Sequence, residues 1–309
     1  MEIKYSIIIP HKNIPQLLQR CLDSIPFRGD VQVIVVDDSS DPSIVNFENF
    51  PGIKRPNVEV YLTEEGRGAG YARNVGLQHV KGKWILFADA DDAFACNFLN
   101  ILDEYSCSDN DIVYFSITGL DHNNNKSYRD YAYDLYFEYA KYKDDMYLYY
   151  YSIYQPWGKL YSTKMIVSNN ILFEEVSVSN DRLFSVKSVF YSNSISIDNR
   201  KIYVSYTNCN SLTFKKDPLS EKIRLLVDIN LNKFLISGGF EKYHINIYKL
   251  LWTRCMKFDL LYFFNTSKIL LSSFSGKILI ADISNFLIKE IPRVVFLRVK
   301  RYNKLKRSI

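Results

Sequence analysis

The sequence predicts an α/β fold built on a doubly wound, mainly parallel β-sheet. Four short runs rich in β-branched residues lie within the first hundred positions, at Tyr5–Ile9, Val31–Val36, Val58–Leu62 and Trp84–Phe87. Stretches with helical spacing of apolar residues separate these runs. Apolar runs without polar alternation are typical of strands covered on both faces, and their alternation with helices is typical of a parallel sheet.

Composition and charge indicate a globular protein. The chain has 309 residues, of which 47% are hydrophobic and 24% charged, enough for one large α/β unit with an appendage. The five cysteines are scattered and form no C-x-x-C pair, which argues against a disulfide framework or a zinc site. No signal peptide is visible at the N-terminus, and we expect a reducing, cytoplasmic setting.

Polar residues follow each predicted strand. They are His11 and Lys12 after the first, Asp37 to Ser40 after the second, Thr63 to Gly68 after the third and Asp89 to Asp92 after the fourth. Ligands of doubly wound sheets collect at the carboxyl ends of the strands. These side chains are therefore expected to converge on one edge, although a turn or helix cap explains Asp37 to Ser40 equally well.

Three carboxylates, Asp89, Asp91 and Asp92, stand within four residues. Like charges this close repel strongly unless a cation or an array of donors lies between them. Hard divalent ions take oxygen ligands and often bind through carboxylates together with substrate phosphates. The cluster therefore predicts a site for Mn²⁺ or Mg²⁺ and a phosphate-bearing ligand.

The glycine-rich stretch Gly66 to Gly70 raises a second possibility, a dinucleotide or P-loop site. Its spacing is not G-x-G-x-x-G, it follows the third strand, and no Gly-Lys-Ser/Thr comes after it. A helix start follows instead, so Arg67 or Arg73 can face a phosphate-bearing ligand.

Five motifs in order resemble family 2 glycosyltransferases with the GT-A fold, whose sheet is mixed and mainly parallel. They are Ser6–Pro10, Cys21–Ile25, Val33–Ser40, Gly70–Leu77 and Trp84–Asp92, and they cover about the first hundred residues. The resemblance implies that the donor is a nucleotide sugar, typically a UDP-sugar.

Site residues follow from the resemblance position by position. Pro10 and the neighbouring His11 would line the nucleoside pocket, and Asp38 would accept a hydrogen bond from the base. Asp89, Ala90 and Asp91 match the D-x-D signature, whose carboxylates hold the ribose and a divalent metal at the diphosphate. Arg73 would lie near the diphosphate. The additional Asp92 leaves open which carboxylates meet the ion.

A second match resembles the acceptor half of the family. It comprises Pro156–Tyr161 and Ser179–Phe184, and it places Trp157, Lys159 and Asn180 on the acceptor side. Asp181 matches the catalytic base, although Asn180 stands where the family usually has Glu. The simpler alternative is that Asp181 is the N-cap of a helix beginning at Arg182.

The remaining chain divides into predicted regions. Residues 1–217 would form the catalytic domain, with a nucleotide-sugar half at 1–105 and an acceptor half at 106–217, and residues 218–309 a helical C-terminal region. Eleven of the 24 tyrosines lie between Tyr128 and Tyr154, where they can contact sugar or lipid, or simply pack on the sheet. The apolar segment from Ile269 to Ile288 is expected to be packed helix, because Lys277 and Asp282 interrupt it.

The end of the chain predicts a basic amphipathic helix. Its apolar stripe is Ile291, Val294, Val295, Val299, Tyr302 and Leu305, and seven Lys or Arg with no acid follow from Arg293 onward. Such a helix can lie on the anionic inner face of a membrane or pack as a solvated helix, and both remain open. No nucleic-acid-binding signature accompanies the basic charge.

The expected function is inverting transfer of a sugar from a UDP-sugar to a saccharide or lipid-linked saccharide acceptor, in bacterial surface polysaccharide synthesis. A carboxylate base would deprotonate the acceptor hydroxyl as it attacks the anomeric carbon. Two alternatives remain open. One is a catalytically degenerate binding protein with the same fold, and the other is a sugar-nucleotide pyrophosphorylase.

Overall fold

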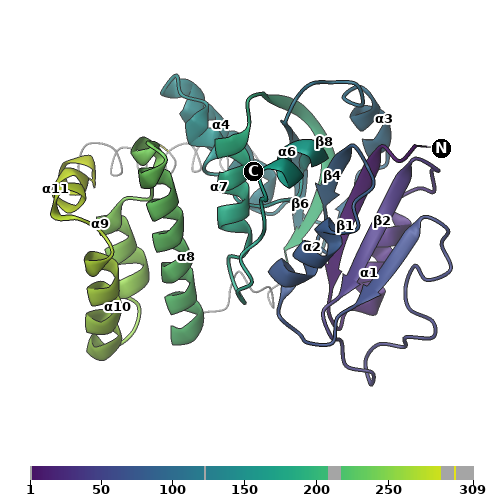
Figure 1. Cartoon of the computed structure of the whole chain (residues 1–309), viewed down its shortest axis with the longest axis horizontal. Coiled ribbons are helices and arrows are strands. Elements are labelled where there is room, and N and C mark those ends of the chain that lie inside the picture. Colours follow the sequence, from purple (N-terminus) through teal and green to yellow (C-terminus); the bar gives the residue numbers. More distant parts are fainter. Residues whose placement is uncertain (1, 122, 208–216, 287–295, 297–309) are drawn as a thin grey trace. The chain divides into compact units, whose positions relative to one another are not determined.

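The computed structural model describes residues 2–121, 123–207, 217–286 and 296 of the chain (Figure 1). The chain forms two compact units. The sheet unit comprises residues 1–131 and 154–209, and the helical unit comprises residues 132–153 and 210–309. The predicted domain boundary between residues 217 and 218 stays a prediction. Helix α8 begins at this point, with Asp217 as its N-cap.

One mixed sheet of eight strands organises the sheet unit, in the order β3-β2-β1-β4-β7-β6-β8-β5. Strands β1 to β4 are parallel to one another. Strand β7 is antiparallel to both β4 and β6, β8 is parallel to β6, and β5 is antiparallel to β8. The strands are β1 (Tyr5–His11), β2 (Val31–Asp37), β3 (Val58–Leu62), β4 (Trp84–Phe87), β5 (Ala93–Phe94), β6 (Ile112–Asp121), β7 (Lys159–Ser162) and β8 (Ile195–Thr207).

The four predicted strands are confirmed, and β1 and β2 extend slightly further. Both are buried along their whole length, and His11 pairs with Asp37 at their carboxyl ends. This register brings the polar residues after β1 and β2 to the same edge of the sheet. The helices of the unit are α1 (Pro15–Asp23), α2 (Ala69–Leu77), α3 (Phe98–Asp103), α6 (Thr163–Ser168) and α7 (Asp181–Tyr191).

Helix α2 packs closely on the central strands. A Cβ atom at Gly76 would lie 2.6 Å from Cγ2 of Ile8, so only glycine allows this approach. The helix follows Gly68, whose φ of +92° is a conformation that side chains rarely adopt. Glycines therefore fix where α2 begins and how near it lies to β1.

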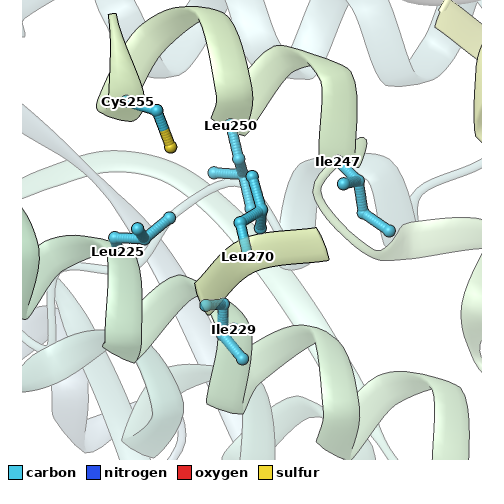
Figure 2. Packing of buried hydrophobic residues seen from close by; sticks show 6 residues of the cluster. All are labelled: Leu225, Ile229, Ile247, Leu250, Cys255 and Leu270. Carbon is cyan, nitrogen blue, oxygen red and sulfur yellow. The ribbon is translucent and has the colours of Figure 1, made fainter. Parts of the chain in front are cut away.

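The helical unit has a small apolar core of its own (Figure 2). It consists of Leu225, Ile229, Ile247, Leu250, Cys255 and Leu270. Its elements are α5 (Tyr147–Tyr150), α8 (Pro218–Ser237), η2 (Glu241–Tyr243), α9 (Ile247–Leu250), the π-helical turn η3 (Leu251–Cys255), α10 (Leu260–Ser272) and α11 (Gly276–Asn285), with most of α4 (Arg129–Tyr142).

Two predictions for the later part of the sequence can be compared with the structure. The apolar segment from Ile269 is helical, but it is divided between α10 and α11. In the part of the chain that the structure describes, no helix is both long enough and apolar enough to cross a bilayer. The predicted basic helix of residues 291–305 lies almost wholly outside the described residues.

Part of the tyrosine-rich stretch packs within the helical unit. The rings of Tyr147 and Tyr151 lie 5.8 and 5.1 Å from the ring of Tyr243. The hydroxyl of Tyr243 lies 3.1 Å from a carboxylate oxygen of Asp145, which also pairs with Lys242 at 2.5 Å. These tyrosines therefore pack against helical elements of their own unit.

Candidate functional site

The side chain of Asp37 stabilises the turn after β2. Its carboxylate accepts hydrogen bonds from Nδ1 of His11 at 2.7 Å and from the hydroxyl and amide of Ser40 at 2.6 and 2.9 Å. Although burial raises the pKa of Asp37, these bonds hold it below its ordinary value. Nε2 of His11 accepts from the amide of Ile14, so both ring nitrogens have protein partners. The side chain of His11 therefore supports the strand ends.

Asp38 has a different environment, as the anchor of the loop that leads into α2. Its two carboxylate oxygens accept from the backbone amides of Arg67 and Gly68, each at 2.9 Å. Lys12 lies 3.5 Å away. Because Lys12 also donates to Oδ2, Oδ1 is the oxygen whose second lone pair these bonds do not use. The turn interpretation therefore applies to Asp37. Asp38 instead connects the end of β2 to the loop before α2, at the edge of the sheet where a nucleoside is expected.

The three aspartates after β4 form one cluster. One carboxylate oxygen from each of Asp89, Asp91 and Asp92 lies within 4.8 Å of the others. Burial and the charge of Asp89 raise the pKa of Asp91 to about 6, and burial with both neighbours raises that of Asp92 well above its ordinary value. Bringing these charges together is therefore costly, and a cation offsets the cost. An all-oxygen donor set suits Mg²⁺ or Mn²⁺.

Strand β8 holds this cluster from one side. The hydroxyl of Tyr203 donates to Asp92 at 2.9 Å and accepts from the amide of Asp89 at 2.9 Å. The amide of Tyr206 donates to the other oxygen of Asp92 at 2.7 Å. Asp92 is almost completely buried, whereas Asp89 and Asp91 are partly exposed. No sequence signal pointed to Tyr203 or Tyr206, which lie over a hundred residues away from the cluster.

Cationic side chains surround the aspartates. Arg20 donates to the carbonyl oxygen of Asp91 and stacks over the ring of Tyr206 at 4.0 Å. Arg129 donates to the hydroxyl of Ser205 at 2.6 Å. Both guanidinium groups lower the pKa of Asp91, although burial and Asp89 outweigh them. This edge of the sheet thus carries carboxylates that can bind a cation and arginines that can bind an anionic ligand.

Arg73 links the aspartate cluster to the later half of the unit. Its side chain is buried and donates to Asp89 at 2.6 Å and to Oδ1 of Asn180 at 2.9 Å. Its guanidinium carbon lies 5.3 Å from the centre of the Phe173 ring. Its Nε atom has no hydrogen-bond partner among the described residues. A single cation thus bridges the D-x-D signature and the residue before Asp181.

The segment that leads to Asp181 is docked directly onto α2. Asn74 exchanges two hydrogen bonds with the backbone of Phe173, at 2.9 and 3.0 Å, and Arg67 pairs with Glu175. A Cβ atom at Gly70 would lie only 2.2 Å from the carbonyl oxygen of Glu174. Helix α2 therefore sets the position of residues 173–180 by backbone contact.

Asp181 is the first residue of α7, so it is not the N-cap of a helix beginning at Arg182. Asn180 occupies the N-cap position without a side-chain capping bond. Burial raises the pKa of Asp181, Arg73 and Arg182 oppose the rise, and Asp89 adds to it. The electrostatic neighbours of Asp181 therefore include the bridging arginine and the first aspartate of the cluster.

The other predicted site residues are buried. Pro10 lies near the end of β1 and Ala90 shortly after β4. The ring of Trp157 stacks on that of Tyr203, with ring centres 5.1 Å apart. Lys159 is buried with its ammonium 4.7 Å from the centre of the Tyr114 ring. Burial lowers the pKa of Lys159 to about 7, and Asp181 opposes this shift. Trp157 thus packs against Tyr203, whose hydroxyl hydrogen-bonds to Asp89 and Asp92.

Comparisons with known proteins find similar glycosyltransferases. The chain is 24% identical over 253 residues to the glycosyltransferase GlyA of Streptococcus pneumoniae, which covers 73% of this chain and 35% of GlyA. It is 26% identical over 211 residues to the poly(ribitol-phosphate) beta-N-acetylglucosaminyltransferase TarS of Staphylococcus aureus, covering 65% of this chain and 35% of TarS. The chain thus spans about a third of the length of these curated relatives.

Solved structures share the fold. Residues 1–349 of S. aureus TarS in complex with UDP-GlcNAc superpose with a TM-score of 0.64 at 19% identity, covering 89% of this chain and 83% of the other. A mannosyltransferase from Pyrobaculum calidifontis in complex with GDP-Man and Mn²⁺ gives a TM-score of 0.56 at 16% identity, covering 98% and 85%. The fold is therefore the predicted GT-A fold with a helical C-terminal region.

The family model "Glycosyl transferase family 2" matches residues 6–167, which include β1 to β4, α2 and the whole aspartate cluster. The match covers more than half of the chain and contains the motifs that the structure gathers at the sheet edge. The chain is a member of glycosyl transferase family 2.

Proposed function

We propose that the chain is an inverting, metal-dependent glycosyltransferase that moves a sugar from a UDP-sugar to a saccharide or lipid-linked saccharide. The observation that carries this proposal is the bridge made by Arg73, which joins Asp89 to Asn180 and so links the D-x-D cluster to Asp181. Donor and acceptor chemistry need these two groups side by side, because attack and departure occur at one carbon.

On the donor side, Pro10 and Asp38 would meet the nucleoside and the D-x-D carboxylates the ribose and a metal ion. Asp91, Asp92 and Asp89 are the residues that would hold Mn²⁺ or Mg²⁺. When bound, the ion supplies positive charge to the diphosphate as the sugar–phosphate bond breaks. Arg73 would add donors on the same side. TarS in complex with UDP-GlcNAc and the mannosyltransferase with GDP-Man and Mn²⁺ support this assignment.

On the acceptor side, Asp181 would act as the base. An acceptor hydroxyl is a poor nucleophile near neutrality, so a carboxylate within hydrogen-bond reach must take its proton during attack. Burial raises the pKa of Asp181, which makes it a stronger proton acceptor, and Arg73 opposes the rise because it favours the ionised form. Attack opposite the leaving group inverts the anomeric centre, so an α-linked donor gives a β-linked product.

The relatives suggest the biosynthetic process in which the chain acts. TarS is a poly(ribitol-phosphate) beta-N-acetylglucosaminyltransferase, and GgaA of Bacillus subtilis, 34% identical over 111 residues, is a minor teichoic acid biosynthesis protein. We therefore place the acceptor among bacterial surface polymers or their lipid-linked precursors, handled at the inner face of the membrane. The competing idea of a degenerate binding protein rests partly on Asn180, which stands where the family usually has Glu. Asn180 still offers a side-chain oxygen that accepts a hydrogen bond from Arg73, so its presence alone does not argue against catalysis.

Release of UDP from a panel of nucleotide sugars with Mn²⁺ tests the proposal, since slow donor hydrolysis needs no acceptor. Asp181→Asn should lower transfer by about 10³-fold while UDP affinity is retained. Asp91→Ala should abolish metal-dependent donor binding as well, and Asp23→Asn, an exposed carboxylate on α1, is the matched control. Transfer at the wild-type rate in Asp181→Asn would exclude Asp181 as the base, and metal-independent UDP release would exclude the metal site.

A further inference from the structure

Helix α10 turns large apolar side chains away from the core of its own unit. Leu261 is 70% exposed and Phe264 63% exposed, and Leu260 and Leu271 are also exposed. Their spacing places them within one sector of the helix, and Leu270, which lies in the core, is outside that sector (Figure 2). We call these four residues, together with the exposed Trp252 and Met256 of the preceding segment, the apolar surface.

Small polar residues of the same helix point inward instead. Thr266 and Ser267 are buried, and their hydroxyls bond to the backbone carbonyls of Tyr262 and Phe263 at 2.7 and 2.6 Å. A helix that faces water has its polar residues outside and its large apolar residues inside. Helix α10 departs from this arrangement, because large apolar side chains share its outer face with Lys268, which indicates that this face contacts something other than water.

The exposed charge near the apolar surface is mainly positive. Of the five basic residues between positions 249 and 286, Arg254 and Lys257 pair with the buried carboxylates of Glu221 and Asp228, whereas Lys268 and Lys277 are exposed. Of the two acids, Asp282 is buried against His244 at 3.0 Å, and Asp259 is exposed and caps α10 by accepting from the amide of Tyr262 at 2.8 Å. Lys268 and Lys277 therefore give this neighbourhood a net positive exposed charge.

We propose that the apolar surface docks onto an anionic lipid membrane. Trp, Phe and Leu side chains beside lysines suit the boundary between headgroups and acyl chains. A second copy of the chain is a poorer occupant, because a symmetric contact through this surface would bring the lysines of both copies together. The proposal is independent of the proposed chemistry, because it concerns residues of the helical unit alone.

The protein carries a natural reporter for this contact. Of its three tryptophans, Trp84 and Trp157 are buried and Trp252 is 68% exposed. Vesicles of phosphatidylcholine and phosphatidylglycerol in equal amounts should shift the Trp252 emission to shorter wavelength, and brominated acyl chains should quench it. The Trp252→Phe variant should lose the shift while it still sediments with the vesicles.

Paired variants separate this surface from general hydrophobicity. Leu261→Glu with Phe264→Glu should weaken vesicle binding by at least about tenfold, since two apolar side chains no longer insert. The matched control is Phe27→Glu with Leu62→Glu in the sheet unit, where the side chains are 64% and 59% exposed, and its binding should not change. Lys268→Gln with Lys277→Gln should weaken binding to the anionic vesicles by about tenfold or more.

Several results would overturn the proposal. Sedimentation with vesicles without any change in Trp252 emission would place the contact elsewhere, for example in the basic C-terminal segment. Retained binding by a folded Leu261→Glu, Phe264→Glu variant would do the same, with its fold checked by circular dichroism. A wild-type dimer that this variant converts to a monomer would show that a protein covers the surface.

Discussion

Replacing Gly70 with alanine tests how α2 positions the proposed base. In an exposed helix, Gly→Ala stabilises by roughly 0.5–1 kcal/mol, because glycine loses more conformational freedom on folding. Here the new Cβ would lie 2.2 Å from the carbonyl oxygen of Glu174 and 3.0 Å from Cβ of Asn180. Such contacts essentially never fall below 3.0 Å, so the Glu174 carbonyl must retreat by about 0.8 Å.

That displacement acts on the segment that ends at Asp181. A misplacement of about 1 Å near the reacting groups costs on the order of 10²-fold in rate. We therefore expect Gly70→Ala to lower kcat by about 10²-fold, and to lower the free energy of unfolding by about 1–3 kcal/mol through overpacking. UDP affinity should change much less, because the strand ends that carry Asp38 are not displaced.

The assay compares UDP release, calorimetric UDP binding and thermal unfolding with those of Gly276→Ala. Gly276 is the first residue of α11, and nothing lies within 4 Å of the position its Cβ would take. This control should keep kcat and gain slightly in Tm. If Gly70→Ala behaves like the control, the backbone contact does not position Asp181, and the reasoning is refuted.

Three further substitutions probe the two units. Tyr203→Phe removes the hydroxyl that donates to Asp92 and should weaken Mn²⁺ binding by about tenfold or more with the fold retained; unchanged affinity in a titration would contradict this. Lys159→Met removes a positive charge that favours the ionised form of Asp181, so the acid limb of the kcat–pH profile should move to higher pH. An acid limb that stays in place would contradict the coupling between Lys159 and Asp181. Although burial lowers the pKa of His244, its bonds to Asp282 and a carbonyl raise it above 6.5. The stability from this pair is therefore present below pH 6.5 and lost as pH rises through the folded-state pKa, so denaturant unfolding should show a pH slope that His244→Gln lacks.

The parallel half of the fold was predictable because its signals are local. Strands β1 to β4 are short apolar runs, and their ends carry the polar motifs within a few residues. Strand β8 is a contrary case, because five of its first seven residues are polar or charged and its apolar run, Ile202 to Val204, is short. Its place beside β6 depends on pairing across about eighty residues, which a pattern along the chain does not encode.

The site shows the same division between local and long-range information. Local patterns placed Asp38 and the D-x-D cluster at strand ends, and the family resemblance singled out Arg73, within α2, and Asp181, at the start of α7. Local pattern alone did not separate Asp37 from Asp38, since the two differ only in which partners the folded chain brings to them, and only the resemblance pointed to Asp38. One receives His11 and the other the amides of the loop before α2.

The same physics narrows the roles of the three aspartates. Both oxygens of Asp92 already accept hydrogen bonds from β8, and Asp89 is shared with Arg73, which competes with a metal ion for its charge. Asp91 is partly exposed, and burial with the neighbouring negative charge raises its pKa to about 6, so a bound cation would favour its ionised form at a position that a ligand can reach. We therefore infer that Asp91 is the main metal ligand, that Asp92 orients the cluster through β8, and that Asp89 divides its charge between Arg73 and the donor.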